Sequence, residues 1–259
     1  MTGIRRLAAS ACMRTANWLA DGGSGQEDDS PFSVFLTPNA LAINKARQDH
    51  LASLELDLQR KRILEVGAGI GLHTPFFLER QCDVVVSDGN LDNVAEIRRR
   101  HSTLRVEHVD LEKDASLEKL GTFDIVYCYG LLYHLANPER AIAQLAKVCR
   151  GQILLETCVS LGKHSEVIFL RDFVSNNQAV SGIGCRPSRL WLKEALERYF
   201  GHAYFAKTQP AHPDFPTDWD CPLTNLLYRG IFVGSRAPLE NPHLTRDIPR
   251  QQLALSSAG

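Results

Sequence analysis

The sequence predicts an α/β fold in which a doubly wound, mostly parallel sheet carries helices on both faces. The first observation is a strand, glycine loop and helix unit at Arg62 to Thr74, RILEVGAGIGLHT. The second is that short apolar runs alternate with helical segments from there to Cys158. Strands that alternate with helices are typical of a parallel sheet whose crossover helices cover its faces.

The glycine loop predicts a nucleotide-binding site. Ile63, Leu64 and Val66 read as a buried strand, and Gly67 and Gly69 permit a tight turn that lets backbone approach a ligand closely. A strand, glycine loop and helix in this order form a cradle for a nucleotide at the carboxyl edge of a parallel sheet.

The spacing of the loop separates two classes of cofactor. A dinucleotide fingerprint requires glycine or alanine at the third small position of G-x-G-x-x-G/A, where this chain has Leu72. This position disfavours a nicotinamide dehydrogenase. The run from Glu65 through Gly71 instead reads acidic-x-G-x-G-x-G, which resembles motif I of the class I S-adenosylmethionine (SAM) methyltransferases.

The strands that follow strengthen this resemblance, which runs from Arg62 to about Thr157. Gln81 to Ser87 is a second strand that ends at Asp88, ~20 residues after the glycines, where a carboxylate accepts hydrogen bonds from ribose hydroxyls. The third strand, Leu104 to Val109, ends at Asp110 and Leu111, where the resemblance places the adenine edge.

The remaining elements complete the predicted sheet. The resemblance implies seven strands with the last one antiparallel. We expect the other strands at Phe123–Cys128, Gly151–Cys158, Ala203–Lys207 and Leu226–Ser235, and helices at Pro38–Gln59, Asn90–His101, Pro138–Cys149 and Ser188–Phe200.

The chain divides by composition into three parts. Residues 1–30 form an N-terminal extension and flexible linker, read as a short helix or frayed tail, with an organelle presequence as the alternative. The resemblance implies that residues 31–235 form the methyltransferase domain, and residues 236–259 read as a loosely held tail. Within the domain, residues 159–189 are an insertion too long for an ordinary connection, which predicts a substrate lid.

Composition limits the partners. The chain has 29 Lys and Arg against 30 Asp and Glu, a net charge of −1, so no global field collects nucleic acid, although a local basic patch such as Arg98 to His101 could suffice. The seven cysteines are scattered without a CxxC pair, which predicts reduced thiols in a cytoplasmic protein and no metal site. No apolar run reaches the ~18 residues that span a bilayer. A homodimer stays open as an alternative.

The predicted cofactor contacts follow from these strand ends and from the resemblance. Arg47 lies within the first helix, where it either reaches the SAM carboxylate or is solvated. The residues expected at the cofactor are Arg47, Glu65, Gly67, Gly69, Asp88, Asp110, Leu111 and Tyr129.

The predicted catalytic residues follow the fourth and fifth strands. Methyl transfer depends mainly on aligning the reactants, and a base is needed only when the acceptor loses a proton. His134 is the first candidate, because imidazole titrates near neutral pH, although it could instead cap the following turn. Tyr133 would shape the methyl pocket or hydrogen-bond the acceptor, and Glu156 is the alternative base.

The loop segments suggest a class of acceptor. YGLLYHLANP, beginning at Tyr129, and GCRPSRLW, beginning at Gly184, resemble bacterial methyltransferases that act on sugars and natural products. Arg171, Arg186 and Arg189 suit an anionic group on the substrate, unless they pair with nearby acids. We therefore expect methyl transfer to a small-molecule acceptor, at a hydroxyl oxygen. The alternatives are a SAM-superfamily enzyme that modifies the transfer RNA wobble uridine, which the first segment also resembles, and a non-catalytic partner protein with this fold.

Overall fold

The structure is a computed structural model that describes residues 30–113, 117–171, 182–221 and 227–255. The chain divides into two compact units, Met1–Ser30 and Pro31–Gly259. The predicted N-terminal extension lies outside the described residues except for Ser30, so the second unit alone is considered below.

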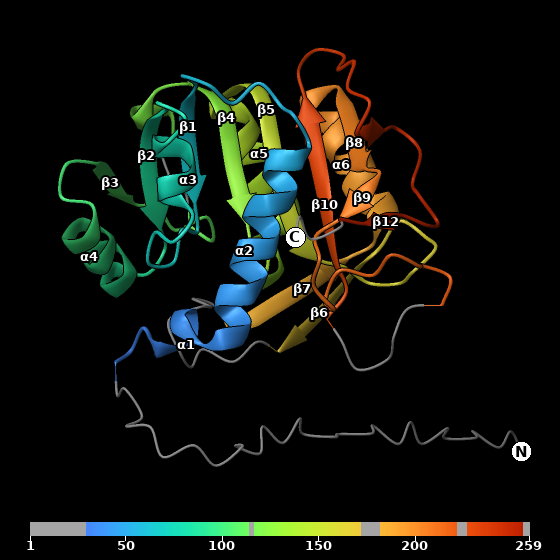
Figure 1. The fold of residues 1–259 in the computed structure, drawn as a ribbon, viewed down its shortest axis with the longest axis horizontal. Coiled ribbons are helices and arrows are strands. Elements are labelled where there is room, and N and C mark those ends of the chain that lie inside the picture. Colours follow the sequence, from blue (N-terminus) through green and yellow to red (C-terminus); the bar gives the residue numbers. More distant parts are fainter. Residues whose placement is uncertain (1–29, 114–116, 172–181, 222–226, 256–259) are drawn as a thin grey trace, which may run out of the picture. The chain divides into compact units, whose positions relative to one another are not determined.

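An eight-stranded sheet forms the centre of this unit, in the order β11-β8-β10-β5-β4-β1-β2-β3 (Figure 1). Strands β1 to β5 pair in parallel, whereas β10 is antiparallel to both of its neighbours. The strands are β1 (Arg62–Val66), β2 (Asp83–Asp88), β3 (Arg105–His108), β4 (Phe123–Tyr129), β5 (Cys149–Cys158), β8 (His202–Ala206), β10 (Arg229–Ser235) and β11 (Leu244–Thr245).

The predicted doubly wound sheet is thus confirmed, with one correction to the strand count. All seven predicted strands are present, and the antiparallel seventh is β10. The eighth strand, β11, adds to the outer edge of β8 from a segment that the sequence had suggested was a tail. A strand of two residues has no apolar alternation from which it could be recognised.

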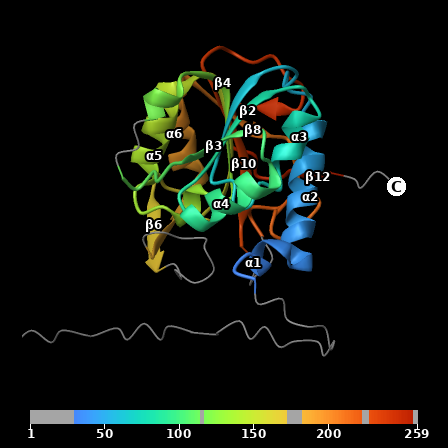
Figure 2. The same cartoon turned by 90° about the vertical axis from the view of Figure 1, so that its left-hand side faces the viewer.

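Helices cover both faces of the sheet, which stands between two helical layers in Figure 2. One core joins α5 and α6 to the sheet, and the other joins α2, α3 and α4 to the opposite face. The helices are α1 (Ser33–Leu36), α2 (Pro38–Ser53), α3 (Thr74–Leu78), α4 (Leu91–Arg100), α5 (Pro138–Val148) and α6 (Arg189–Phe200), with 3-10 turns η1 (Leu117–Leu120) and η2 (Leu132–His134).

Helix α2 is shorter than predicted, because it ends at Ser53 instead of Gln59. Glu55 has a φ of 49°, a left-handed backbone conformation that a helix cannot continue through. The carbonyl of Leu54 accepts a hydrogen bond of 2.8 Å from Asn241 Nδ2. A residue 187 positions away thus satisfies the carbonyl at the end of this helix. Such a long-range contact cannot be inferred from the periodicity of the helix sequence.

The described part of the predicted insertion forms a hairpin. Strands β6 (Val167–Arg171) and β7 (Ile183–Pro187) pair antiparallel, with Ile168 opposite Arg186. Ile168 and Phe169 are exposed. The residues between the two strands, 172–181, lie outside the described residues, and the lid function expected for 159–189 stays a prediction.

The segment after Arg236 is packed against the domain, contrary to the expected loose tail. Besides β11, it contributes β12 (Leu253–Ala254), which pairs in parallel with β9 (Thr208–Gln209). Arg236 donates from Nε to the carbonyl of Cys149 at 3.1 Å and from Nη1 to that of Tyr199 at 2.7 Å. Polar contacts and short strand pairings hold this segment, which is why its sequence lacks the apolar pattern of a core element.

Candidate active site

The glycine loop after β1 turns around the end of β2. The backbone N–H of Ala68 donates to the carbonyl of Ser87 at 3.0 Å, and the N–H of Gly69 donates to Asp88 Oδ2 at 2.8 Å. Gly67 and Gly69 have φ values of 65° and 58°, which glycine adopts without strain. The predicted strand, loop and acidic strand end therefore meet at the carboxyl edge of the sheet.

Asp88 fits the role of a ribose ligand. Its carboxylate is 7% exposed and accepts three hydrogen bonds, from Gly69 N, Asn90 N and Asn93 Nδ2. A carboxylate has about four acceptor sites, so one remains for a further donor such as a hydroxyl. Burial raises the pKa of the Asp88 carboxyl, while the same hydrogen bonds act to lower it.

Side chains approach the loop closely enough to require glycine. A Cβ at Gly67 would lie 2.8 Å from Leu131 side-chain atoms, and one at Gly69 would lie 2.8 Å from Phe35 Cε1. Phe35 belongs to α1 and Leu131 immediately precedes η2. Two elements that are distant in sequence therefore cover the cradle in which a nucleoside would lie.

Asp110 follows β3 at the same edge of the sheet. It is 8% exposed, accepts a hydrogen bond of 3.0 Å from Glu112 N and pairs with Lys113 at 3.2 Å. Leu111 is 4% exposed and packs in the core. The structure therefore leaves the backbone of Leu111, rather than its side chain, as the group that could face an adenine.

A second group of buried polar side chains lies behind the loop. Thr74 Oγ1 donates to Glu65 at 2.7 Å, and burial raises the pKa of Glu65 to about 7. His73 Nδ1 lies 2.6 Å from Tyr127 Oη, and burial, followed by the charge of Arg47, lowers the pKa of His73 to about 3. Tyr129 stacks on Tyr127 with ring centroids 4.3 Å apart. At neutral pH, His73 is therefore an uncharged member of this layer.

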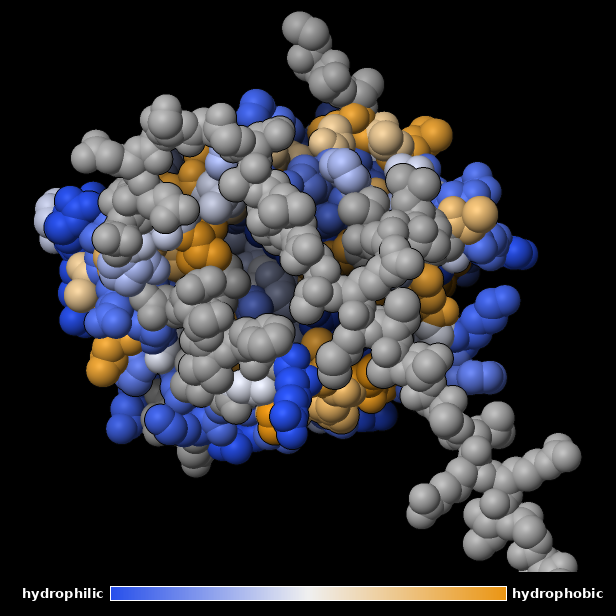
Figure 3. All heavy atoms as spheres, turned by 90° about the horizontal axis from the view of Figure 1, so that it is seen from below, coloured by the Kyte–Doolittle hydropathy of each residue, from blue (hydrophilic) through white to orange (hydrophobic). Residues whose placement is uncertain are grey.

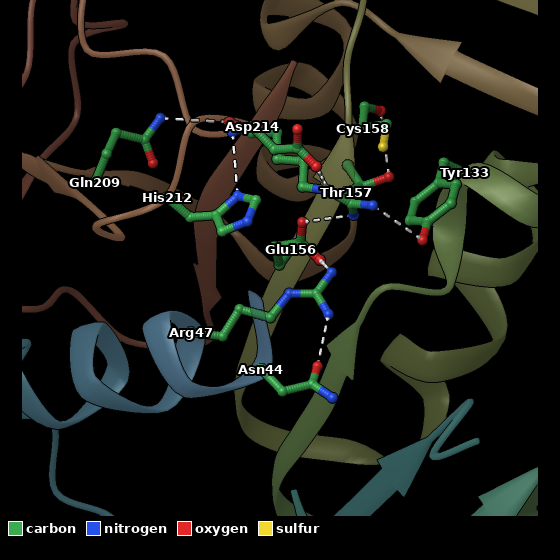
Figure 4. A network of polar contacts seen from close by, with 10 residues as sticks. Asn44, Arg47, Tyr133, Glu156, Thr157, Cys158, Gln209, His212 and Asp214 are labelled. Carbon is green, nitrogen blue, oxygen red and sulfur yellow. Dashed lines mark hydrogen bonds and ion pairs between the residues drawn. The ribbon is translucent and has the colours of Figure 1, made fainter. Parts of the chain in front are cut away.

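A buried ion network joins α2, β5 and β10 beside the loop. Arg47 Nη2 lies 2.5 Å from Glu156 Oε2, and in Figure 4 Arg47 extends from α2 toward Glu156 on β5. Arg229 Nη1 lies 3.1 Å from the other oxygen, Glu156 Oε1, and Arg229 Nε lies 3.4 Å from Asp214 Oδ2. Glu156 is fully buried. Arg47 is therefore not solvated, which was one of the two alternatives from the sequence, because its guanidinium is buried and paired with Glu156.

Arg229 and Asp214 are site residues that the sequence did not reveal. Arg229 lies within the predicted seventh strand and begins β10. This strand pairs antiparallel with β5, which brings Arg229 opposite Cys158 and near Glu156. A signal existed in the sequence, since an arginine at the start of a buried strand is costly to leave unpaired. Its partner could not be identified without the strand pairing.

Tyr133 and His134 lie on η2, directly after the edge of the sheet. Tyr133 Oη accepts a hydrogen bond of 3.5 Å from Arg229 Nη2. The guanidinium carbons of Arg229 and Arg186 lie 5.0 and 5.4 Å from the centroid of the Tyr133 ring. The half-buried His134 ring lies 4.1 Å from that of Tyr133, centroid to centroid. The structure therefore brings together all three predicted catalytic residues, Tyr133, His134 and, through Arg229, Glu156.

The other predicted substrate arginines differ in their surroundings. Arg189 donates to the carbonyl of Pro249 at 2.5 Å and lies 4.0 Å from the Trp219 ring centroid. Its contacts therefore stabilise the fold. Burial lowers the pKa of Arg189 to about 10. Arg171 is exposed on β6. Phe215 and Trp219 are both buried.

The basic cluster at the end of α4 is largely neutralised. Arg99 Nε and Arg100 Nε each lie 2.7 Å from Glu96, and Arg98 donates to the carbonyl of Val106 at 2.9 Å. Hydrogen bonds, first that from Arg99, lower the pKa of Glu96 to about 2.

Viewed from below, the described surface at the carboxyl edge mixes hydrophilic and hydrophobic residues (Figure 3). No helix in the described part of the chain is long and apolar enough to span a membrane.

A family model described as a methyltransferase domain matches residues 41–209, which is more than half of the chain. The chain is also 31% identical over 121 residues to a ubiquinone biosynthesis O-methyltransferase of Xanthomonas oryzae pv. oryzae, covering 45% of this chain and 50% of that protein. It is 31% identical over 147 residues to a tRNA U34 carboxymethyltransferase of Azotobacter vinelandii, covering 54% and 46% of the two chains. The chain thus spans about half the length of these curated relatives.

Solved structures share the fold at lower identity. The N-terminal domain of EvdMO1 with SAH bound superposes with a TM-score of 0.54 at 22% identity, covering 75% of this chain and 80% of that one. Magnesium protoporphyrin IX methyltransferase of Synechocystis PCC 6803 with bound SAM gives a TM-score of 0.52 at 14% identity, covering 83% and 87%. Both comparisons support the α/β fold described above.

Proposed function

Because the chain belongs to the methyltransferase domain family and has the class I SAM-dependent fold, we propose that it transfers a methyl group from SAM to a hydroxyl oxygen of a small molecule. The observation that carries this proposal is the hydrogen bond from Gly69 N to Asp88, formed at the carboxyl edge of the sheet next to η2. Cofactor cradle and candidate acceptor residues share this one edge, where ligands bind in open α/β sheets.

The cofactor would be held by groups of known placement. Asp88 would take the ribose hydroxyls, Asp110 and the backbone of Leu111 would face the adenine, and the glycine backbone would line the amino-acid end. When bound, SAM supplies a methyl group on a positively charged sulfur, which makes that methyl electrophilic. The enzyme's own contribution is then chiefly to align the acceptor, and alignment alone can supply up to ~7 to 11 kcal/mol.

Within this proposal, Glu156 positions other residues instead of acting as the base. Its two oxygens are bound by Arg47 and Arg229, so neither is available to a hydroxyl proton without breaking a buried ion pair. His134 is the better candidate, because it lies half-buried on η2 beside Tyr133. Tyr133 would then orient the acceptor, with Arg229 fixing the position of its phenol.

A transfer RNA substrate is the second candidate, and the match to the tRNA U34 carboxymethyltransferase favours it. The charge distribution argues against it. The chain has a net charge of −1. In its most concentrated basic run, Arg98 to His101, Arg99 and Arg100 are paired with Glu96. A binding titration with total transfer RNA at two salt concentrations separates the candidates, since RNA affinity falls steeply with salt.

The activity test uses the purified full chain, radiolabelled SAM and a panel of hydroxylated sugars and phenols. Calorimetry should show SAM binding near micromolar affinity, equivalent to ~8 kcal/mol, and no tight binding of NAD. Label should appear in at least one small molecule. Tight SAM binding without any transfer, to small molecules or RNA, would indicate the non-catalytic alternative.

The His134→Ala variant tests the base. It should lower turnover about a hundredfold or more while leaving SAM affinity nearly intact, which is the usual scale of general-base catalysis. His243→Ala is the matched control, because His243 lies on the C-terminal segment near the exposed Glu55. Full activity with a flat pH profile in His134→Ala would remove His134 from catalysis.

A further inference from the structure

Arg186 is a third guanidinium beside the buried ion network, and it differs from the other two in its partners. Arg47 and Arg229 both pair with Glu156, and Arg229 also pairs with Asp214. Arg186 lies half-buried on β7 and donates from Nη1 to the carbonyl of Cys185 at 2.8 Å and to that of Tyr133 at 3.4 Å. No carboxylate in the described ranges lies within 4.0 Å of it.

Among the residues that the structure describes, the charges near Arg186 do not balance without a further anion. Arg47, Arg186 and Arg229 carry three positive charges, against the two negative charges of Glu156 and Asp214. Two of the cations also share one aromatic ring, since Arg186 and Arg229 lie 5.4 and 5.0 Å from the Tyr133 centroid. Like charges on one ring repel each other, and a bound anion would reduce that repulsion.

The surroundings of Cys158 report the same concentration of positive charge. Burial raises the pKa of the Cys158 thiol to about 11. The charge of Glu156 also acts to raise it, while the charges of Arg229, Arg186 and Arg47 each act to lower it. The three guanidinium groups, from α2, β7 and β10, therefore all lie near this buried sulfur on β5.

We propose that Arg186 is the specificity residue of the acceptor site and that it binds an oxyanion, a carboxylate or a phosphate, carried by the methyl acceptor. This inference rests on the proposed function and narrows its substrate class to anionic hydroxyl compounds. Nη1 is used by backbone carbonyls, whereas no partner within the described residues occupies Nε or Nη2 of Arg186. These two groups form the edge of the guanidinium that binds an oxyanion in a bidentate manner.

The placement of Arg186 also explains how an anion would orient the acceptor. Its guanidinium touches Tyr133, which lies next to His134 on η2. An acceptor held at Arg186 would therefore present its hydroxyl to the residues proposed to align it and remove its proton. Arg171 and Arg189 do not have this geometry, because one is exposed on β6 and the other is bound to Pro249 and stacked on Trp219.

The test compares matched probes on the full chain saturated with S-adenosylhomocysteine. The probes are 3-hydroxybenzoate, its neutral analogue 3-hydroxybenzamide, and 3-hydroxyphenyl phosphate, titrated to millimolar concentration by ligand-observed NMR. We expect at least one of the two anions to bind about tenfold more tightly than the amide, the scale of one charge-assisted contact. The better anion identifies carboxylate or phosphate as the preferred group.

Three variants connect the selectivity to Arg186. Arg186→Met should bind acid and amide equally, while Arg171→Met, which removes an exposed arginine from the partner strand of the same hairpin, should keep the wild-type preference. If Arg186→Met is unstable, Arg186→Lys replaces it: this variant retains the positive charge and should keep part of the wild-type preference for the acid over the amide. Equal binding of acid and amide by the wild type, no anion binding, or unchanged selectivity in Arg186→Met would each overturn the inference. Failure of the proposed function would appear separately, as absent SAM binding or absent transfer.

Discussion

The Glu156→Gln substitution is the sharpest perturbation of the buried ion network. Glu156 is fully buried, and each of its oxygens contacts a different guanidinium, at 2.5 Å from Arg47 and 3.1 Å from Arg229. The side chains of these two arginines are only 9% and 7% exposed. Glutamine keeps the size of the side chain but leaves two buried cations facing each other without their shared anion.

The expected loss is large compared with the stability of a typical domain. Removing one partner of a buried ion pair costs about 3 to 5 kcal/mol, because it leaves an uncompensated buried charge. The total free energy of unfolding of a domain is about 5 to 15 kcal/mol. For a domain of about 150 to 250 residues, this loss corresponds to a decrease of roughly 6 to 20 °C in Tm.

The assay is urea unfolding followed by circular dichroism, with thermal unfolding as a second measurement. Glu139→Gln is the matched control: its partner Arg198 and Glu139 itself are 59% and 47% exposed, so its loss should stay below about 1 kcal/mol. A loss of less than about 1 kcal/mol in Glu156→Gln would refute the reasoning. In a double-mutant cycle with Arg47→Gln, the two substitutions should be non-additive by more than about 0.5 kcal/mol.

Three further substitutions test other parts of the site and its surroundings. Asp88→Ala should weaken SAM binding by about 1.5 to 3 kcal/mol in calorimetry, because a charged acceptor is lost, and unchanged affinity in the folded variant would exclude Asp88 from the ribose site. Gly67→Ala should destabilise the domain by more than about 1 kcal/mol, since the new Cβ would need a left-handed φ and would meet Leu131 at 2.8 Å. Burial lowers the pKa of His50 from 6.5 to about 4, so the unfolded chain binds the extra proton and His50 removes stability as pH falls below about 6.5. His50→Gln should therefore reduce the slope of unfolding free energy against pH between 6.5 and 4 by up to about 1.4 kcal/mol per pH unit relative to wild type. An unchanged slope would contradict this reasoning.

The cofactor half of the site could be predicted from sequence because its determinants are local. Gly67 and Gly69 follow an apolar strand, Asp88 ends the next strand and Asp110 follows the one after, so parallel pairing places all four at one edge. Each of these residues needs only the strand that precedes it to be recognised. This is why the placement of the glycine loop and of the acidic strand ends agrees with the structure.

The acceptor half could not be predicted in the same way, because its contacts join distant segments. Glu156 and Arg229 are 73 residues apart, and only the antiparallel pairing of β10 with β5 brings them together. The packed C-terminal segment was missed for a related reason, since Asn241 and the two-residue strand β11 act through backbone contacts that leave no apolar periodicity. The sequence also could not distinguish Arg186 from the other two candidate substrate arginines, Arg171 and Arg189, whose surroundings differ in the structure.

The position of β10 has a consequence for how the protein can be cut. The family match ends at residue 209, but β10, which begins at Arg229, lies between β5 and β8 in the middle of the sheet. A fragment trimmed to the matched residues would lose an interior strand and expose two unpaired strand edges, a common cause of aggregation. A fragment made for expression should therefore retain the chain through Leu255, where the last described strand has just ended.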